Sequence, residues 1–138
     1  MSSHSSSVEY AELRARTHFS FLRGASSPEE IVQRAARLGL SAIGIADRDG
    51  VYGIPKAYHA LKALREAAPE AGEVCGRERL PKLITGAELT LEGLPRLTLL
   101  ALDRAGYGLM CRLLTASHAG KEKGQAALAW VEFLKLAE

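Results

Sequence analysis

The sequence has little of the features that define several large protein classes. Its 138 residues include only two cysteines, Cys75 and Cys111, whose spacing fits no motif, so we expect free thiols in a reducing compartment. No apolar run reaches membrane-spanning length, and residues 1–7 lack the apolar segment of a signal peptide. The net charge of +2 is too small to require a nucleic acid or a membrane as partner. We therefore expect a soluble, cytoplasmic protein with one domain at 10–138, after a disordered serine-rich tail at 1–9.

The remaining sequence alternates between patterns typical of strands and of helices. Ser27-Pro28-Glu29-Glu30, for example, combines a helix cap, a first-turn proline and a capping box. The expected elements are, in chain order, a strand at 10–16, a helix at 27–38 that stops at Gly39, a buried strand at 41–46, a helix at 55–67, an irregular loop at 69–81, a stretch at 82–91 counted as two strands across a small-residue break, a strand at 97–102, a helix capped by Asp103, and a last helical stripe from Ala127. This β-α-β-α-β-β-β-α-α order predicts an α/β fold with mainly parallel strands and flanking helices.

Polar residues follow the expected strands at the edge where α/β proteins gather ligands. Arg14 and Arg16 are two apart, so on a strand both side chains leave the same face. Two metal ligands would have this spacing, but a guanidinium carries only donors and cannot coordinate a cation. As alternatives, the two arginines could form the solvated face of an edge strand, and Asp47 could cap the turn that follows it. The candidate site residues are Arg14, Arg16, Arg23, Asp47, Arg48 and Glu88.

Four motifs follow one another along the chain: Phe19-Ser20-Phe21-Leu22-Arg23-Gly24-Ala25-Ser26, Ala46-Asp47-Arg48-Asp49-Gly50-Val51-Tyr52-Gly53, Ile84-Thr85-Gly86-Ala87-Glu88-Leu89 and Tyr107-Gly108-Leu109-Met110-Cys111-Arg112-Leu113-Leu114. In this order they resemble the opening segments of a PHP (polymerase and histidinol phosphatase) domain. They are similar to the N-terminal region of bacterial C-family DNA polymerases, and to the error-prone branch of the polymerase III alpha-subunit family in particular. The resemblance implies a distorted β/α barrel with a metal cluster at its mouth, of which this chain holds an incomplete part.

The chain departs from this family at the metal ligands. The family's first two histidines fall on Arg14 and Arg16, its motif aspartate on Arg23, and its second-motif histidine on Arg48. Asp47 and Glu88 survive, although only Glu88 stands where the family has a ligand. One carboxylate among four guanidiniums is no ligand set for Zn²⁺ or Mn²⁺, so we expect no metal, no cofactor and no catalytic residue. We expect instead a network in which guanidiniums pair with carboxylates, with Glu12, Asp47, Asp49 and Glu88 as candidate partners.

The resemblance implies a metal-free PHP module that acts as scaffold for the core of an error-prone polymerase in translesion synthesis, DNA repair and replication. Its implied partners are the palm and thumb regions, DNA indirectly and mutagenesis accessory proteins, with no membrane. β/α barrels commonly need ~200–250 residues, so the chain covers about the first half of one, and no nucleotidyl transfer is expected on these residues. Whether it is an enzyme is left open. The alternatives are a small metal-dependent phosphoesterase that uses Asp47, Glu88 and His18, or a free-standing interaction domain.

Overall fold

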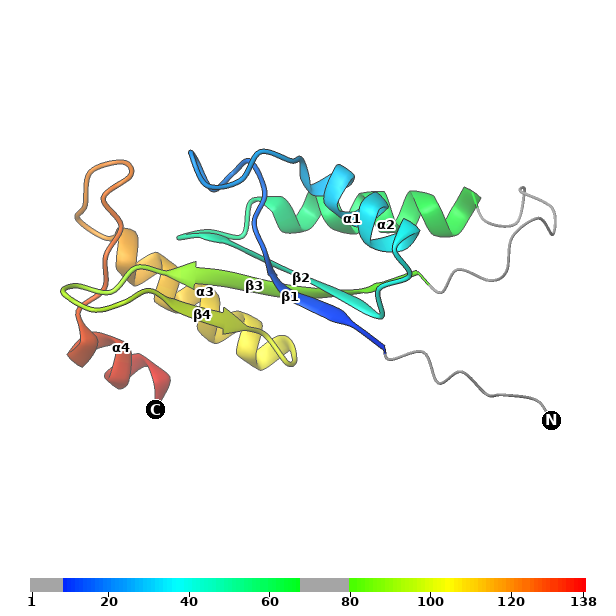
Figure 1. Ribbon diagram of the computed structural model, residues 1–138. Coiled ribbons are helices and arrows are strands. Elements are labelled where there is room, and N and C mark those ends of the chain that lie inside the picture. The colour runs from blue at the N-terminus through cyan, green and yellow to red at the C-terminus, as the bar shows by residue number, and fades with distance from the viewer. Residues whose placement is uncertain (1–8, 68–79) are drawn as a thin grey trace.

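The computed structural model describes residues 9–67 and 80–138 (Figure 1). The predicted tail, apart from residue 9, and most of the predicted loop at 69–81, with Cys75, lie outside the described residues. The elements are β1 (Ala11–Ala15), α1 (Pro28–Arg37), β2 (Ala42–Arg48), α2 (Gly53–Ala67), β3 (Lys82–Leu89), β4 (Leu97–Leu100), α3 (Arg104–His118) and α4 (Trp130–Ala137). No helix within these ranges is long and apolar enough to cross a membrane.

The strands form a curled sheet of four in the order β1-β2-β3-β4 within the described ranges. The β1/β2 and β2/β3 pairs are parallel and the β3/β4 pair is antiparallel, which confirms the predicted α/β fold. The prediction of two strands across 82–91 was wrong. Gly86 pairs with Ala46 on one side and Leu100 on the other, so the ladder runs through the small residues without a break. Glycine fits there because a Cβ would lie 2.8 Å from Leu100 Cδ2 and 2.9 Å from the Leu99 carbonyl oxygen.

The first two helices pack together over β2, in the upper half of Figure 1. The capping box that begins α1 is present, because the Ser27 hydroxyl accepts from the Glu30 amide and the Glu30 carboxylate accepts from the Ser27 amide. The shared core of these elements consists of Val32, Ile45, Ala57 and Leu61. The α2 helix begins at Gly53, two residues before the predicted start.

The third helix builds a second core against β3 and β4. The core's fully or nearly fully buried members are Ala87, Leu89, Leu91, Met110, Leu113, Leu114 and Leu128. Asp103 caps α3 as predicted, by accepting from the Gly106 amide at 2.8 Å. The last helix begins at Trp130 and not near Ala127, because Leu128 is extended and pairs with Leu91 in a single parallel bridge.

The helices leave one sheet face free for polar side chains. Ile45 and Ala87 belong to the two cores beneath the helices. Since successive side chains of a strand point to opposite faces, Arg48 and Glu88, which are paired in register, project from the other face. Both lie at the carboxyl ends of parallel strands. The fold therefore brings β2 and β3 side chains together at the edge where the sequence predicts a site.

Candidate functional site

Glu88 lies at the centre of an ion cluster that joins β1 to β3. Its side chain is only 5% exposed, and its Oε1 atom accepts a hydrogen bond from the Arg16 guanidinium. Arg14 Nη2 lies 3.5 Å from the same oxygen. The two arginines extend from one face of the end of β1, as their spacing predicts, although Arg14 remains more than half exposed. We call Arg14, Arg16 and Glu88 the arginine–glutamate cluster.

The second carboxylate oxygen of Glu88 is not used in the ion pairs of this cluster. Glu88 Oε2 is buried and makes no hydrogen bond within the described part of the protein. A carboxylate with a free oxygen can accept further donors or a cation, but here two guanidiniums already adjoin it. The positive charge of Arg14 and Arg16 opposes the approach of a metal ion to that oxygen.

Arg48 pairs with Asp49 in the loop after β2. Arg48 Nε lies 3.3 Å from Asp49 Oδ2, and the Asp49 carboxylate also accepts from the Thr90 amide and hydroxyl at 2.7 and 2.8 Å. Asp49 is nearly buried and has a φ of 50°, in the left-handed region that aspartate tolerates better than most residues. This carboxylate thus fixes the β2 loop to the end of β3 and holds the arginine beside it.

Asp47 points to the opposite face and fastens the loop after β1. Its carboxylate accepts from the Thr17 amide and hydroxyl, both at 2.8 Å, and from the Ser20 hydroxyl at 2.7 Å. All three residues are essentially buried. The expectation that Asp47 joins the arginine network was therefore wrong, because its neighbour Arg48 takes the face toward Glu88. Glu12 is likewise engaged elsewhere, by the Tyr10 hydroxyl and the Arg14 amide.

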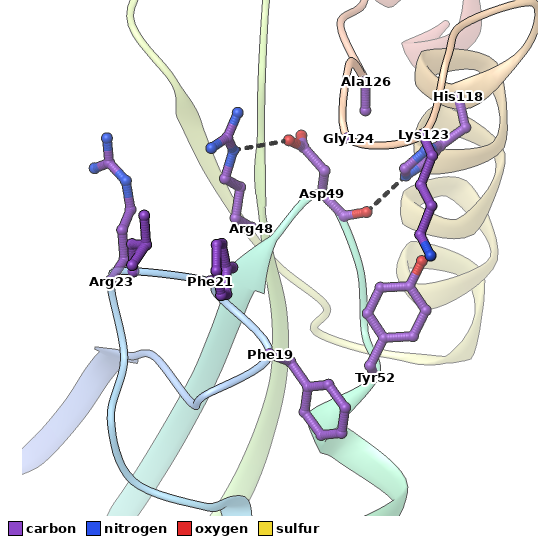
Figure 2. A pocket seen from close by; sticks show the side chains of 11 residues that line it. Phe19, Phe21, Arg23, Arg48, Asp49, Tyr52, His118, Lys123, Gly124 and Ala126 are labelled. Atoms are coloured by element: carbon purple, nitrogen blue, oxygen red, sulfur yellow. Dashed lines mark hydrogen bonds and ion pairs between the residues drawn. The ribbon is translucent and has the colours of Figure 1, made fainter.

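The loop that Asp47 fastens carries Arg23, the remaining candidate arginine. Arg23 lies in an exposed turn, and within 9–67 and 80–138 no carboxylate lies within 4.0 Å of it. It lines a hollow of ≈ 1020 Å³ together with Arg48 (Figure 2). We call this space the basic hollow; its other lining residues are Phe19, Phe21, Leu22, Asp49, Tyr52, His118, Lys123, Gly124 and Ala126.

The residues of the phosphoesterase alternative do not come together. Asp47 faces the helices, Glu88 faces away from them, and His18 is an exposed residue whose ring lies 4.7 Å from that of Phe19. His118, at the end of α3, places Nε2 2.8 Å from the Asp49 carbonyl oxygen. Because a carbonyl oxygen only accepts, Nε2 carries the hydrogen in this contact. Asp47, Glu88 and His18 thus do not form an acid–base pair that faces a common site.

The residues present do not fit the metal cluster that the fold implies. Within the described ranges, no group of three or more His, Cys, Asp or Glu side chains could hold a metal ion. The arginines that the motif resemblance predicts at ligand positions have guanidiniums, which offer only hydrogen-bond donors and bear the same sign of charge as the ion. No step of a mechanism can therefore be assigned to a metal in this site.

Sequence reasoning missed the residues that hold the site in place. Thr17 and Ser20 looked like ordinary loop residues, and the pairing of Asp49 with Thr90 spans two loops that no local pattern connects. The approach of Lys123 to the hollow depends on the direction of α3. A partial signal existed at Asp49-Gly50, a turn pair whose aspartate can adopt a positive φ.

Comparison with known proteins identifies the family. Residues 12–135 match the model of the PHP domain. The chain is 50% identical over 117 residues to an error-prone DNA polymerase of Anaeromyxobacter sp. (strain K), which covers 81% of this chain and 9% of that polymerase. It is 43% identical over 151 residues to the error-prone DNA polymerase of Ruegeria pomeroyi, a match that covers 92% of this chain and 14% of that polymerase. It is 38% identical over 133 residues to error-prone DNA polymerase 1 of Agrobacterium fabrum, a match that covers 96% of this chain and 11% of that polymerase. The chain thus spans about a tenth of the length of these relatives.

A solved structure has the same fold. The crystal structure of a proposed metal-dependent phosphoesterase from Bifidobacterium adolescentis aligns with a TM-score of 0.50 and 20% sequence identity, covering 80% of this chain and 35% of that one. At this identity the match concerns the fold alone. It agrees with a partial PHP-type barrel, and the family model extends over nearly all the described residues. The resemblance found in the four motifs is confirmed, and the chain belongs to the PHP domain family.

Proposed function

We propose that the chain is the metal-free PHP module of an error-prone, translesion DNA polymerase and that it acts as a scaffold for the polymerase core. The observation that carries this proposal is the arginine–glutamate cluster, in which two guanidiniums share one oxygen of Glu88. These ion pairs link the first strand to the third across the sheet. The site thus supplies cross-strand attraction, while the charge and donor set of its side chains disfavour a metal ion.

The similarity to error-prone polymerases supports the wider context. At 38–50% identity, three such polymerases match more than four-fifths of this chain. The partners that follow are the palm and thumb regions of such a polymerase, DNA reached through them, and mutagenesis accessory proteins. Nucleotidyl transfer would take place on the polymerase core and not on the residues of this chain.

Metal binding tests the scaffold proposal directly. The purified chain should bind no stoichiometric zinc or manganese after dialysis against either ion, as measured by elemental analysis. A variant that restores the family's ligand types, with Arg14→His, Arg16→His, Arg23→Asp and Arg48→His, is the matched comparison and should retain metal. Near-equimolar metal in the unchanged chain would refute the proposal.

The polymerase context has its own test. Sequencing beyond the codon of Glu138 should reveal a palm domain with catalytic aspartates in the same reading frame. In that full polymerase, Glu88→Gln should lower the thermal midpoint and the temperature limit of primer extension, while activity at low temperature stays near that of the parent. Loss of activity at all temperatures, with unchanged stability, would contradict a scaffold role.

A further inference from the structure

The basic hollow combines positive charge with exposed aromatic rings. Three segments line it: the loop after β1, the end of β2 with the loop that follows it, and the end of α3 with the connector to α4 (Figure 2). They contribute the cationic side chains of Arg23, Arg48 and Lys123, against the single carboxylate of Asp49 among the described lining residues. The hollow lies at the carboxyl ends of parallel strands, where α/β proteins bind ligands.

The donors of the hollow are available. The Asp49 carboxylate is already occupied by Thr90 and by Arg48 Nε. Among the described residues, the terminal N–H groups of Arg48 have no hydrogen-bond partner. For Arg23 and Lys123, the structure of residues 9–67 and 80–138 gives no carboxylate within 4.0 Å. Figure 2 shows the Arg23 side chain, from the loop after β1, and the Arg48 side chain, from the end of β2, extending in the same direction. Free donors in a locally positive hollow favour an anion with several acceptor oxygens, such as a phosphate.

The aromatic rings are held open to the solvent. Tyr52 is 60% exposed and Phe21 is 79% exposed. Gly50 makes room for the Tyr52 ring, since a Cβ at position 50 would lie 2.2 Å from Tyr52 Cε2. Exposed ring faces beside cations are the arrangement on which proteins stack nucleobases.

Two of the segments that carry these groups are anchored to the fold by hydrogen bonds. The loop after β1 is fastened through Asp47, as described above. In the connector, the Ala127 amide donates to the Ser117 carbonyl oxygen and the Leu128 amide donates to the Thr90 carbonyl oxygen, each at 3.0 Å. Lys123 is therefore presented by an anchored segment, which reduces the ordering cost of binding.

We propose that the basic hollow binds a nucleotide unit. Its phosphate lies against Arg23, Arg48 and Lys123, and its base stacks on Tyr52. The same chemistry belongs to a free nucleotide and to an unpaired DNA strand. None of the three cluster residues lines this hollow, and the proposal does not depend on the scaffold role.

Fluorescence anisotropy of the whole chain tests this site. The probes are a labelled oligothymidylate of about 10 nucleotides and, as competitors, thymidine monophosphate and inorganic phosphate. Arg23→Gln should weaken oligonucleotide binding and reduce the slope of log K against log salt by about 0.7, the value for one phosphate contact to a single strand. Arg104→Gln is the matched control, because Arg104 is exposed at the start of α3 and lies outside the hollow.

The ring contribution has a control of its own. Tyr52→Leu should weaken binding about fivefold or more, as the loss of one stacked base predicts, whereas Tyr58→Leu should leave it unchanged. Tyr58 is 56% exposed and does not line the hollow. Circular dichroism of each variant shows that its fold is intact.

The competitors distinguish the source of the nucleotide. Competition by thymidine monophosphate at the affinity of the oligonucleotide assigns the site to free nucleotides, whereas much weaker competition assigns it to a DNA strand; both outcomes support the proposal. Three results would overturn it. The first is no binding of either nucleotide probe at low salt, and the second is an equal loss of oligonucleotide affinity in Arg23→Gln and Arg104→Gln. The third is that inorganic phosphate competes as strongly as the nucleotide while Tyr52→Leu leaves the affinity unchanged.

Discussion

Replacing Glu88 with glutamine should destabilise the chain mainly by removing charge. Glutamine keeps the shape and one acceptor oxygen, but it leaves the Arg14 and Arg16 guanidiniums beside each other without the carboxylate that both contact. The effect depends on how far water screens the cluster. The carboxylate is 5% exposed, the Arg16 side chain 25% and the Arg14 side chain 59%.

These exposures place the expected cost between two limits. Breaking a fully buried pair by removing one partner costs roughly 3–5 kcal/mol, and an exposed pair contributes ~0–1 kcal/mol. Since the carboxylate is buried and its better-placed partner is only partly exposed, we expect a loss of about 1.5–3 kcal/mol in the free energy of unfolding. Arg16 should account for most of it, because Arg14 is farther from the carboxylate and more solvated.

Urea unfolding followed by circular dichroism measures this cost. The loss should be largest at about 0.01 M salt and smaller at about 1 M, where the Debye length falls from ~30 Å to ~3 Å. Adding Arg16→Gln should recover part of the loss, because it removes a guanidinium that has lost its partner. Glu122→Gln, a change of the same chemistry at an exposed connector residue, should have little effect. A loss below ~0.5 kcal/mol at low salt, within the range of ordinary surface substitutions, would refute the reasoning.

Three further predictions follow from the loops and the sheet edge. Asp47→Ala should lower the free energy of unfolding, measured by urea titration, by roughly 3–5 kcal/mol, because three buried donors lose their acceptor at ~1–3 kcal/mol each. Thr17→Val removes only one of those donors, so an equal loss in that variant would contradict this prediction. Gly24→Ala should displace the loop after β1, because its Cβ would lie 2.1 Å from the Thr17 carbonyl oxygen; an unchanged thermal midpoint would refute the expected clash. The open edge strand at Leu97–Leu100 should make the isolated chain self-associate in sedimentation velocity or leave it only marginally stable, so a strictly monomeric and highly stable protein would contradict that expectation.

The parts of the fold that the sequence predicted are those decided by local chemistry. The helix that starts at Ser27 could be predicted because its cap, proline and capping glutamate lie within four residues. The nearly all-apolar run that became β2 indicated a strand buried on both faces. The prediction of a break within 82–91 was wrong because small residues can equally mark close packing of neighbouring strands, as they do at Gly86.

In the candidate site, too, local chemistry predicted some of the contacts and long-range packing decided the others. The spacing of Arg14 and Arg16 and the meeting of parallel strand ends predicted that their side chains would approach Glu88. Asp47 could not be assigned from sequence alone, because adjacent residues of a strand face opposite ways and the register between strands decides which one faces Glu88. The contribution of Lys123 to the basic hollow depends on long-range packing that no local pattern specifies.

The arginine–glutamate cluster also limits how this site can change one residue at a time. Glu88 is buried, so replacing Arg16 with histidine would remove a charge-assisted hydrogen bond and leave the carboxylate with the weaker Arg14 contact. Replacing Glu88 would instead leave the guanidiniums repelling one another. The binding of a metal ion could offset either loss of stability only if several ligands were introduced together, because two or fewer ligands do not form a tetrahedral site. Under the proposed scaffold role, the charge pairing takes the place of a metal cluster, and single substitutions toward such a cluster give variants that have neither the pairing nor the metal.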